Sequence, residues 1–332
     1  MSTHTIQVPL PCAPEIWSAS TESIWRRVKG SYPKPLNFNE MVKLLIEDGE
    51  AIHANHPLDG LSLTLILHGL MSMCNDMVHF DNRSIYLSDV EKDEISWKPW
   101  RKRMIHALET WKACYDIYIM TTLQGVQDQE DPRMYANHQA ESVTLLALYH
   151  VAHIVINCEI RHLQAAAGMK AIFGHIVTSA DRVESIQWVK QWVTTHAAAA
   201  DHAAWHAAQM FREGLLYLKK WDAKGEFHYP WCFVIGTLTC WAFHRFGGED
   251  MQPSLCAHRR GAEMTQEQSQ ALMNQLVSLM ASVSTVDVRR TLQKCCTHGL
   301  SREVARYLKN VRWTAAFEAM KLLEGLSDAD SL

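Results

Sequence analysis

The sequence predicts an all-α fold, arranged as a single compact multi-helix domain. Segments with the apolar periodicity of helices follow one another along most of the 332 residues, whereas the period-two alternation typical of strands is almost absent. Hydrophobic residues make up 48% and charged residues 20% of the chain, which is the balance of a globular protein rather than of a disordered one. The linkers between the segments are short, which favours one domain over two separable ones.

The expected elements are helices separated by breakers rich in proline and glycine. An extended N-terminal arm and a first helix are expected over residues 1–36, a helical domain over 37–326 and a tail over 327–332. Gly325 stands where the last helix is expected to stop. The helices predicted within the domain cover residues 38–50, 61–80, 97–123, 139–158, 186–221, 229–246, 265–279, 286–298 and 301–324.

Charge, cysteines and missing motifs argue against several classes of protein. The formal net charge is −4 and no long basic run is present, so direct binding of nucleic acid is not expected. Nine cysteines at scattered spacings, without a secretory signal, predict reduced thiols in an intracellular protein. The most apolar run, Leu61–Met73, is short and contains His68, so no membrane span is expected. No glycine-rich phosphate loop occurs, and no cofactor is expected.

The stretch DHAAWHAAQM, residues 201–210, places His202 and His206 on one helix face, as in zinc peptidases. A zinc site needs a third ligand, and no nearby histidine or cysteine has the required spacing. The glutamate that follows the first histidine in zinc peptidases is Ala203 here. The sequence therefore predicts no bound metal, and a polar helix face that is either solvated or turned towards a cleft.

A second histidine-bearing helix is predicted to be buried, because it is apolar on most sides. Its narrow polar stripe must be hydrogen-bonded internally or must line a cavity. In a cavity, such groups would bind the polar part of a largely apolar ligand or act in acid–base chemistry. The stripe consists of His150, His153, Asn157 and Arg161.

Aromatic residues add candidate walls for such a cavity, because six of the twelve tryptophans fall between residues 188 and 241. Most of these tryptophans are expected to pack in the core or between helices. The residues expected to bind a ligand are His150, Asn157, Trp205, His206, Trp231 and Trp241.

Five segments carry a resemblance to a known family. They are VPLPCAPEIWSASTESIWRR at 8–27, LTLILHGLMSM at 63–73, LALYHVAHIVINCEIRHLQAAAG at 146–168, WHAAQMFREGLLYLKKW at 205–221 with YPWCFVIGTLTCWAFHRFG at 229–247, and SREVARYLKNVRWTAAFEAMKLLEGL at 301–326. In this order and spacing they resemble the fungal-specific transcription factor domain, also called the middle homology region, in the variety that follows two-cysteine, two-histidine zinc fingers. The resemblance implies an all-helical regulatory region and makes His150 and His206 part of a shared scaffold.

Two function classes follow from this resemblance and from the lack of a zinc finger or six-cysteine cluster before the matching segments. The first is a transcription-factor-like regulator of a fungal secondary-metabolite pathway, nuclear and acting through a protein partner or a small apolar ligand. The protein partner would be a DNA-binding factor or a second copy of the chain. The alternative is a cofactor-free cytoplasmic enzyme of secondary metabolism, a pericyclase-like cyclase or isomerase, in which His153 or Arg161 donates a hydrogen bond to a substrate carbonyl. The resemblance favours the regulator.

Overall fold

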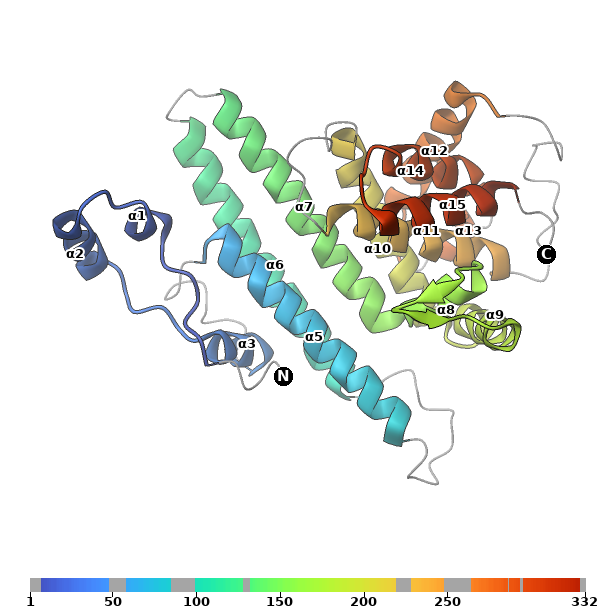
Figure 1. Cartoon of the computed structure of the whole chain (residues 1–332), viewed down its shortest axis with the longest axis horizontal. Helices are drawn as coiled ribbons and strands as arrows, with labels where there is room; N and C mark the ends of the chain where they lie inside the picture. The colour runs from blue at the N-terminus through green and yellow to red at the C-terminus, as the bar shows by residue number, and fades with distance from the viewer. Residues whose placement is uncertain are drawn as a thin grey trace. The chain divides into compact units, whose positions relative to one another are not determined.

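The computed structural model describes residues 7–47, 58–84, 99–127, 132–218, 228–247, 264–285, 287–292 and 295–328. These residues are almost entirely helical, which confirms the all-α prediction (Figure 1). Two-residue strands, β1 (Ala171–Ile172) and β2 (His175–Ile176), pair as an antiparallel hairpin. Packing divides the chain into two compact units, residues 1–138 and 139–332. The domain limits at 36/37 and 326/327 stay predictions.

The first unit is built around three helices whose apolar faces meet. Leu63 and Leu67 of one helix and Trp111 of another are fully buried, and the Trp111 indole Nε1 donates a hydrogen bond to the Leu63 carbonyl at 2.9 Å. The N-terminal arm is held by a bridge between Pro9 and Asn37. The helices of this unit are α1 (Pro14–Trp17), α2 (Glu22–Ser31), α3 (Phe38–Glu47), α5 (Gly60–Ser84) and α6 (Pro99–Gln127).

Within the described part of the chain, two helices are long and apolar enough to cross a membrane, over Gly60–Val78 and His138–Asn157. The apolar run at Leu61–Met73 lies within α5, which extends slightly beyond the helix predicted over 61–80 at both ends. Core helices of soluble proteins pass the same test of length and composition, and 67% of the second span is buried within the protein. The expectation of no membrane span stays a prediction.

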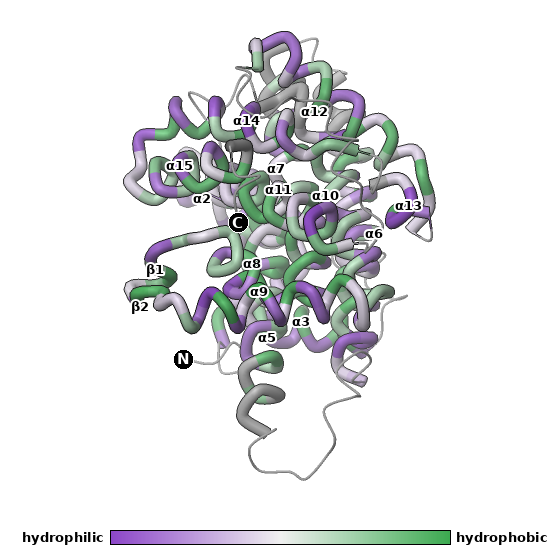
Figure 2. Tube along the Cα trace, turned by 90° about the vertical axis from the view of Figure 1, so that its right-hand side faces the viewer, coloured by the Kyte–Doolittle hydropathy of each residue, from purple (hydrophilic) through white to green (hydrophobic). Residues whose placement is uncertain are grey.

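The second unit packs its helices in a pattern that brings distant parts of the sequence together. Helix α10 lies against α11, as predicted for the segments at 205–221 and 230–246, while α12 packs on α14 and α14 on α15. Figure 2 shows hydrophobic and hydrophilic residues interleaved along α9, as expected of a helix with one buried face. The helices are α7 (Pro132–Asn157, from Gln139 on in this unit), α8 (Ile160–Ala166), α9 (Ser179–Thr194), α10 (Ala197–Leu218), α11 (Tyr229–Phe246), α12 (Gln266–Ala281), α13 (Val288–Leu292), α14 (His298–Leu308) and α15 (Thr314–Asp328).

The structure divides two segments that the sequence predicted as continuous helices. The segment at 186–221 is interrupted because the amide groups of Thr195 and His196 both donate to the Gln191 carbonyl, which closes α9 before α10 begins. The segment at 301–324 is interrupted where the Val311 amide donates to the Leu308 carbonyl. The stop expected at Gly325 is wrong: α15 continues to Asp328, since an isolated glycine weakens a helix without ending it.

Candidate functional site: a buried histidine cluster

Four imidazoles from two helices meet inside the second unit. His150 and His153 come from α7, and His202 and His206 from α10. The stripe side chains His150 and His153 are only 5% and 1% exposed, and His206 is 3% exposed, so the predicted burial of this part of α7 is confirmed. His202 is half-buried.

Small residues on α10 allow this close approach. Five alanines on the helix are fully buried, and their methyl groups keep the helix backbone near its neighbours. They are Ala200, Ala203, Ala204, Ala207 and Ala208. The polar face predicted for this helix is therefore turned inwards at His206 and Gln209, not towards solvent.

Ring packing ties the cluster together. The rings of His153 and His206 are stacked, with centroids 4.0 Å apart and an interplanar angle of 6°. His202 meets both rings edge-on, at 5.4 Å from His153 and 4.5 Å from His206. Tyr149 also stands edge-on to His153, at 4.7 Å. The cluster is thus a compact group of aromatic faces whose nitrogens lie close together.

A chain of hydrogen bonds leads from the cluster to a carboxylate. His206 Nδ1 lies 2.9 Å from His150 Nδ1, and His150 Nε2 lies 3.3 Å from Glu213 Oε2. If His150 is neutral, it donates from Nε2 to the carboxylate and accepts at Nδ1 from His206 Nδ1–H. The Nε2 of His206 then carries a lone pair and no proton.

The remaining nitrogens are less well satisfied. His202 Nε2 lies 3.3 Å from His153 Nδ1, whereas His153 Nε2 is buried without a hydrogen-bond partner. An unpaired buried nitrogen costs free energy, because it has given up its hydrogen bonds to water. The protein alone therefore leaves one position of the cluster open.

Burial favours the neutral form of three of the four histidines, His153, His202 and His206. It lowers the pKa of His153 and of His206 well below the usual 6.5, and the neighbouring imidazoles lower both further. Burial also lowers the pKa of His202. Neutral imidazoles are able to stack and are the form that binds a metal ion.

Two residues of the predicted stripe do not join the cluster. Asn157 Nδ2 donates to the His153 carbonyl of its own helix at 2.8 Å, and the Asn157 carbonyl accepts from Trp192 Nε1 at 2.7 Å. Arg161 is exposed and lies on α8, because α7 ends at Asn157 and the helical spacing is lost there. Of the four residues in the predicted stripe, only His150 and His153 therefore belong to the cluster.

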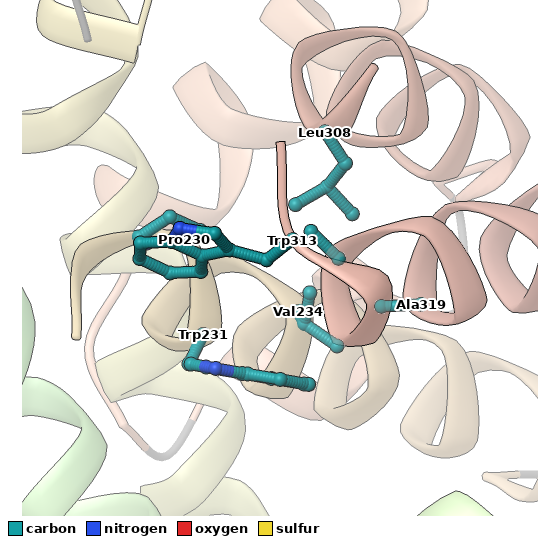
Figure 3. A pocket seen from close by; sticks show the side chains of 7 residues that line it. Pro230, Trp231, Val234, Leu308, Trp313 and Ala319 are labelled. Atoms are coloured by element: carbon teal, nitrogen blue, oxygen red, sulfur yellow. The ribbon is translucent and has the colours of Figure 1, made fainter. Parts of the chain in front are cut away.

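The predicted tryptophan walls lie in different places. Trp205 stands edge-on to His206 at 4.9 Å and donates from Nε1 to the Val283 carbonyl at 3.1 Å. Trp241 packs edge-on against Phe246 on α11. Trp231 lines a shallow apolar hollow between α11 and the C-terminal helices (Figure 3). The residues around this hollow are Pro230, Trp231, Val234, Leu308, Trp313, Ala316 and Ala319, and none of them is a histidine.

Sequence reasoning did not assign His202 and Glu213 to a site, although both share the polar side of α10 with His206. The helical spacing of His202, His206 and Glu213 places them on one side of α10, and this pattern could have been used to group them into one site. The third histidine near the His202–His206 pair is His153, about fifty positions earlier in the chain, and spacing within one helix cannot reveal it. This geometry removes the reason for expecting no metal here.

Comparison with known proteins identifies related sequences. The chain is 30% identical over 328 residues to a nicotinate catabolism cluster-specific transcription factor of Emericella nidulans, covering 98% of the chain and 35% of the relative. It is 22% identical over 243 residues to zinc finger protein klf1 of Schizosaccharomyces pombe, covering 72% of the chain and 28% of that protein. The chain thus spans about a third of the length of the curated relatives it matches. No solved structure matches.

A family comparison agrees with these relatives. Residues 1–113 match the fungal specific transcription factor domain, which overlaps the first two segments that carry the resemblance. The resemblance is therefore confirmed: residues 1–113 match the fungal specific transcription factor domain, and 98% of the chain is similar to a transcription factor.

Proposed function

We propose that this chain is the helical regulatory part of a fungal transcription regulator that controls a catabolic gene cluster. The observation that carries the proposal is the extent of the similarity to a cluster-specific transcription factor, which covers 98% of the chain and so includes both compact units. The relative's name refers to catabolism, and this favours a catabolic over a secondary-metabolite context. Neither relative is named as an enzyme, so the cyclase alternative gains no support.

The chain would act through a protein partner and in the nucleus. A net charge of −4 disfavours binding to DNA by the chain itself, because phosphate neutralisation needs a basic surface. The hollow at Trp231 encloses no space that could hold even a water molecule, whereas sites for small molecules usually hold about 300–1,000 Å³. These two observations favour a protein partner over direct DNA reading and over a small apolar ligand.

A reporter assay tests the proposal. The full chain is fused to an unrelated DNA-binding domain in a fungal host, with that domain alone as the control at matched expression. We expect the fusion to change reporter transcription several-fold and a fluorescent version of the chain to concentrate in the nucleus. Transcript profiling of a deletion strain then identifies the genes under control. A silent reporter together with an unchanged transcript profile would overturn the proposal.

A further inference from the structure

We infer that the histidine cluster is a binding site for a divalent transition-metal ion of the zinc class, held by His153, His202 and His206. One nitrogen from each of the three residues lies within 4.8 Å of the other two. Three histidine ligands with a fourth position open to water or another group are a known arrangement for zinc. The inference rests on the geometry of the cluster and not on the proposed function.

One pair of ring nitrogens already has the separation expected of two zinc ligands. Zinc–nitrogen bonds of about 2.0–2.1 Å in tetrahedral geometry place two ligand nitrogens about 3.3 Å apart. His202 Nε2 and His153 Nδ1 are 3.3 Å apart. An imidazole lone pair lies in the plane of its ring, so the parallel rings of His153 and His206 must tilt towards a common point on binding. Rotation about the side-chain bonds of the half-buried His202 gives the ion a way in.

The protonation pattern suits the same ion. If His150 donates from Nε2 to Glu213 and accepts at Nδ1 from His206, the Nε2 of His206 is unprotonated and free to bind the ion. Outer partners of this kind, which orient a ligating histidine and fix its tautomer, are typical of protein metal sites. Glu213 also supplies negative charge near a buried dication. We therefore assign Glu213 and His150 as positioning residues.

The competing explanation is a hydrogen-bonded core network without an ion. The unpaired His153 Nε2 does not separate the two explanations, because an ion held at Nδ1, which lies 3.3 Å from His202 Nε2, leaves Nε2 unpaired as well. The ion is favoured because one nitrogen from each of three imidazoles lies within 4.8 Å of the other two and gains a bond to it. Borderline ligands such as imidazole suit zinc, copper and nickel, while calcium and magnesium prefer oxygen.

Metal titration of the purified full chain tests the site. The chain is prepared without a polyhistidine tag, stripped with a chelator, and titrated with CoCl₂ and then with ZnCl₂. We expect one Co²⁺ per chain with the visible d–d absorption of a low-coordinate ion, and loss of this absorption as Zn²⁺ displaces it. Thermal unfolding with and without Zn²⁺ provides a second readout, because a ligand that binds only the folded state raises the melting temperature.

Variants identify the ligands. His202→Gln changes the most exposed of the three ligands, so it is the variant most compatible with folding, which circular dichroism checks. We expect it to weaken binding by about tenfold or more and to lose the thermal shift. His196→Gln, just before the same helix, serves as the matched control and should bind as the unaltered chain does. Glu213→Ala should weaken binding about tenfold through loss of the positioning contact.

Three results would overturn the site: no uptake of Co²⁺ by the folded chain, equal affinity in His202→Gln, or an equal loss in His196→Gln. The reporter assay of the proposed function is independent of these results. A chain that regulates transcription without binding metal refutes only the site, and a chain that binds metal without affecting transcription refutes only the proposed function.

Discussion

Ser269 of α12 donates a hydrogen bond from its hydroxyl to the carboxylate of Glu303 of α14, and both residues are fully buried. Arg306 Nη1 binds the two oxygens of the same carboxylate at 2.6 and 2.7 Å. A buried carboxylate is tolerated only when its oxygens are satisfied, so Arg306 supports Glu303 within α14 and the Ser269 hydrogen bond fixes how α14 lies on α12.

Replacing Ser269 with alanine should destabilise the chain. The substitution removes the charge-assisted hydrogen bond that a buried oxygen of Glu303 accepts from Ser269. We expect the free energy of unfolding to fall by about 1–3 kcal/mol. Urea unfolding followed by circular dichroism measures the change. Ser278→Ala, at an exposed position of the same helix, should stay within about 0.5 kcal/mol of the unaltered chain. Equal effects of the two substitutions would contradict the role of this pair.

Gly299→Ala should also destabilise the chain, because α14 approaches the backbone of α12 closely at this point. A Cβ at Gly299 would lie 2.6 Å from the Ser269 carbonyl oxygen, and backbone cannot move aside as a flexible side chain does. We expect a loss of about 1–3 kcal/mol from overpacking. Gly325→Ala is the control: its Cβ meets nothing within 4 Å, so the better helix propensity of alanine should stabilise α15 by about 0.5–1 kcal/mol.

His162 gives the stability of the chain a dependence on pH. Its ring is stacked on Trp188 and bonded to Ser185 at 3.0 Å, and burial lowers its pKa below the usual 6.5 although the nearby Glu159 raises it. Below pH 6.5 the unfolded chain binds this proton more readily than the folded chain does. The contribution of His162 is therefore complete above pH 6.5 and is lost as the pH falls.

Denaturation midpoints of the unaltered chain and of His162→Gln, measured between pH 7.5 and about pH 5, isolate this contribution. The free-energy difference between the two should shrink or reverse as the pH falls, at no more than about 1.4 kcal/mol per pH unit. Titrating groups that do not interact with His162 are common to both proteins and cancel. A difference that stays constant across this range would show that His162 is not responsible.

Thiol reactivity should divide the cysteines by burial. Burial raises the pKa of Cys240 to about 12 and that of Cys74 to about 12, so neither forms the reactive thiolate near neutral pH. Cys12 and Cys296 are half-buried. Brief alkylation of the native chain with iodoacetamide, read by mass spectrometry, should label Cys12 and Cys296 before Cys240 and Cys74. Urea should make all four react at similar rates; early native labelling of Cys240 would contradict the packing of α11.

The sequence predicted those parts of the fold that depend on local pattern. Helix α11 has the predicted bounds because Pro230 fits its first turn and Gly247 follows its last residue. The burial of α7 followed from its apolar sides. The contact between His150 and His206 could not be predicted, because residues 56 positions apart are brought together by tertiary packing alone. Arg161 was misplaced because no proline or glycine marks the end of α7 at Asn157.

The alanine face of α10 has a consequence for how substitutions should be tolerated along this chain. Ala203, Ala204, Ala207 and Ala208 are each 0% exposed, so even one added methylene must displace a neighbour in a close-packed interior. Alanine side chains are single methyl groups without any polar or reactive atom. In a saturation screen they should nevertheless rank among the least replaceable positions, with only glycine or serine surviving at some of them, while the larger and more distinctive Trp17, 85% exposed, should accept most replacements.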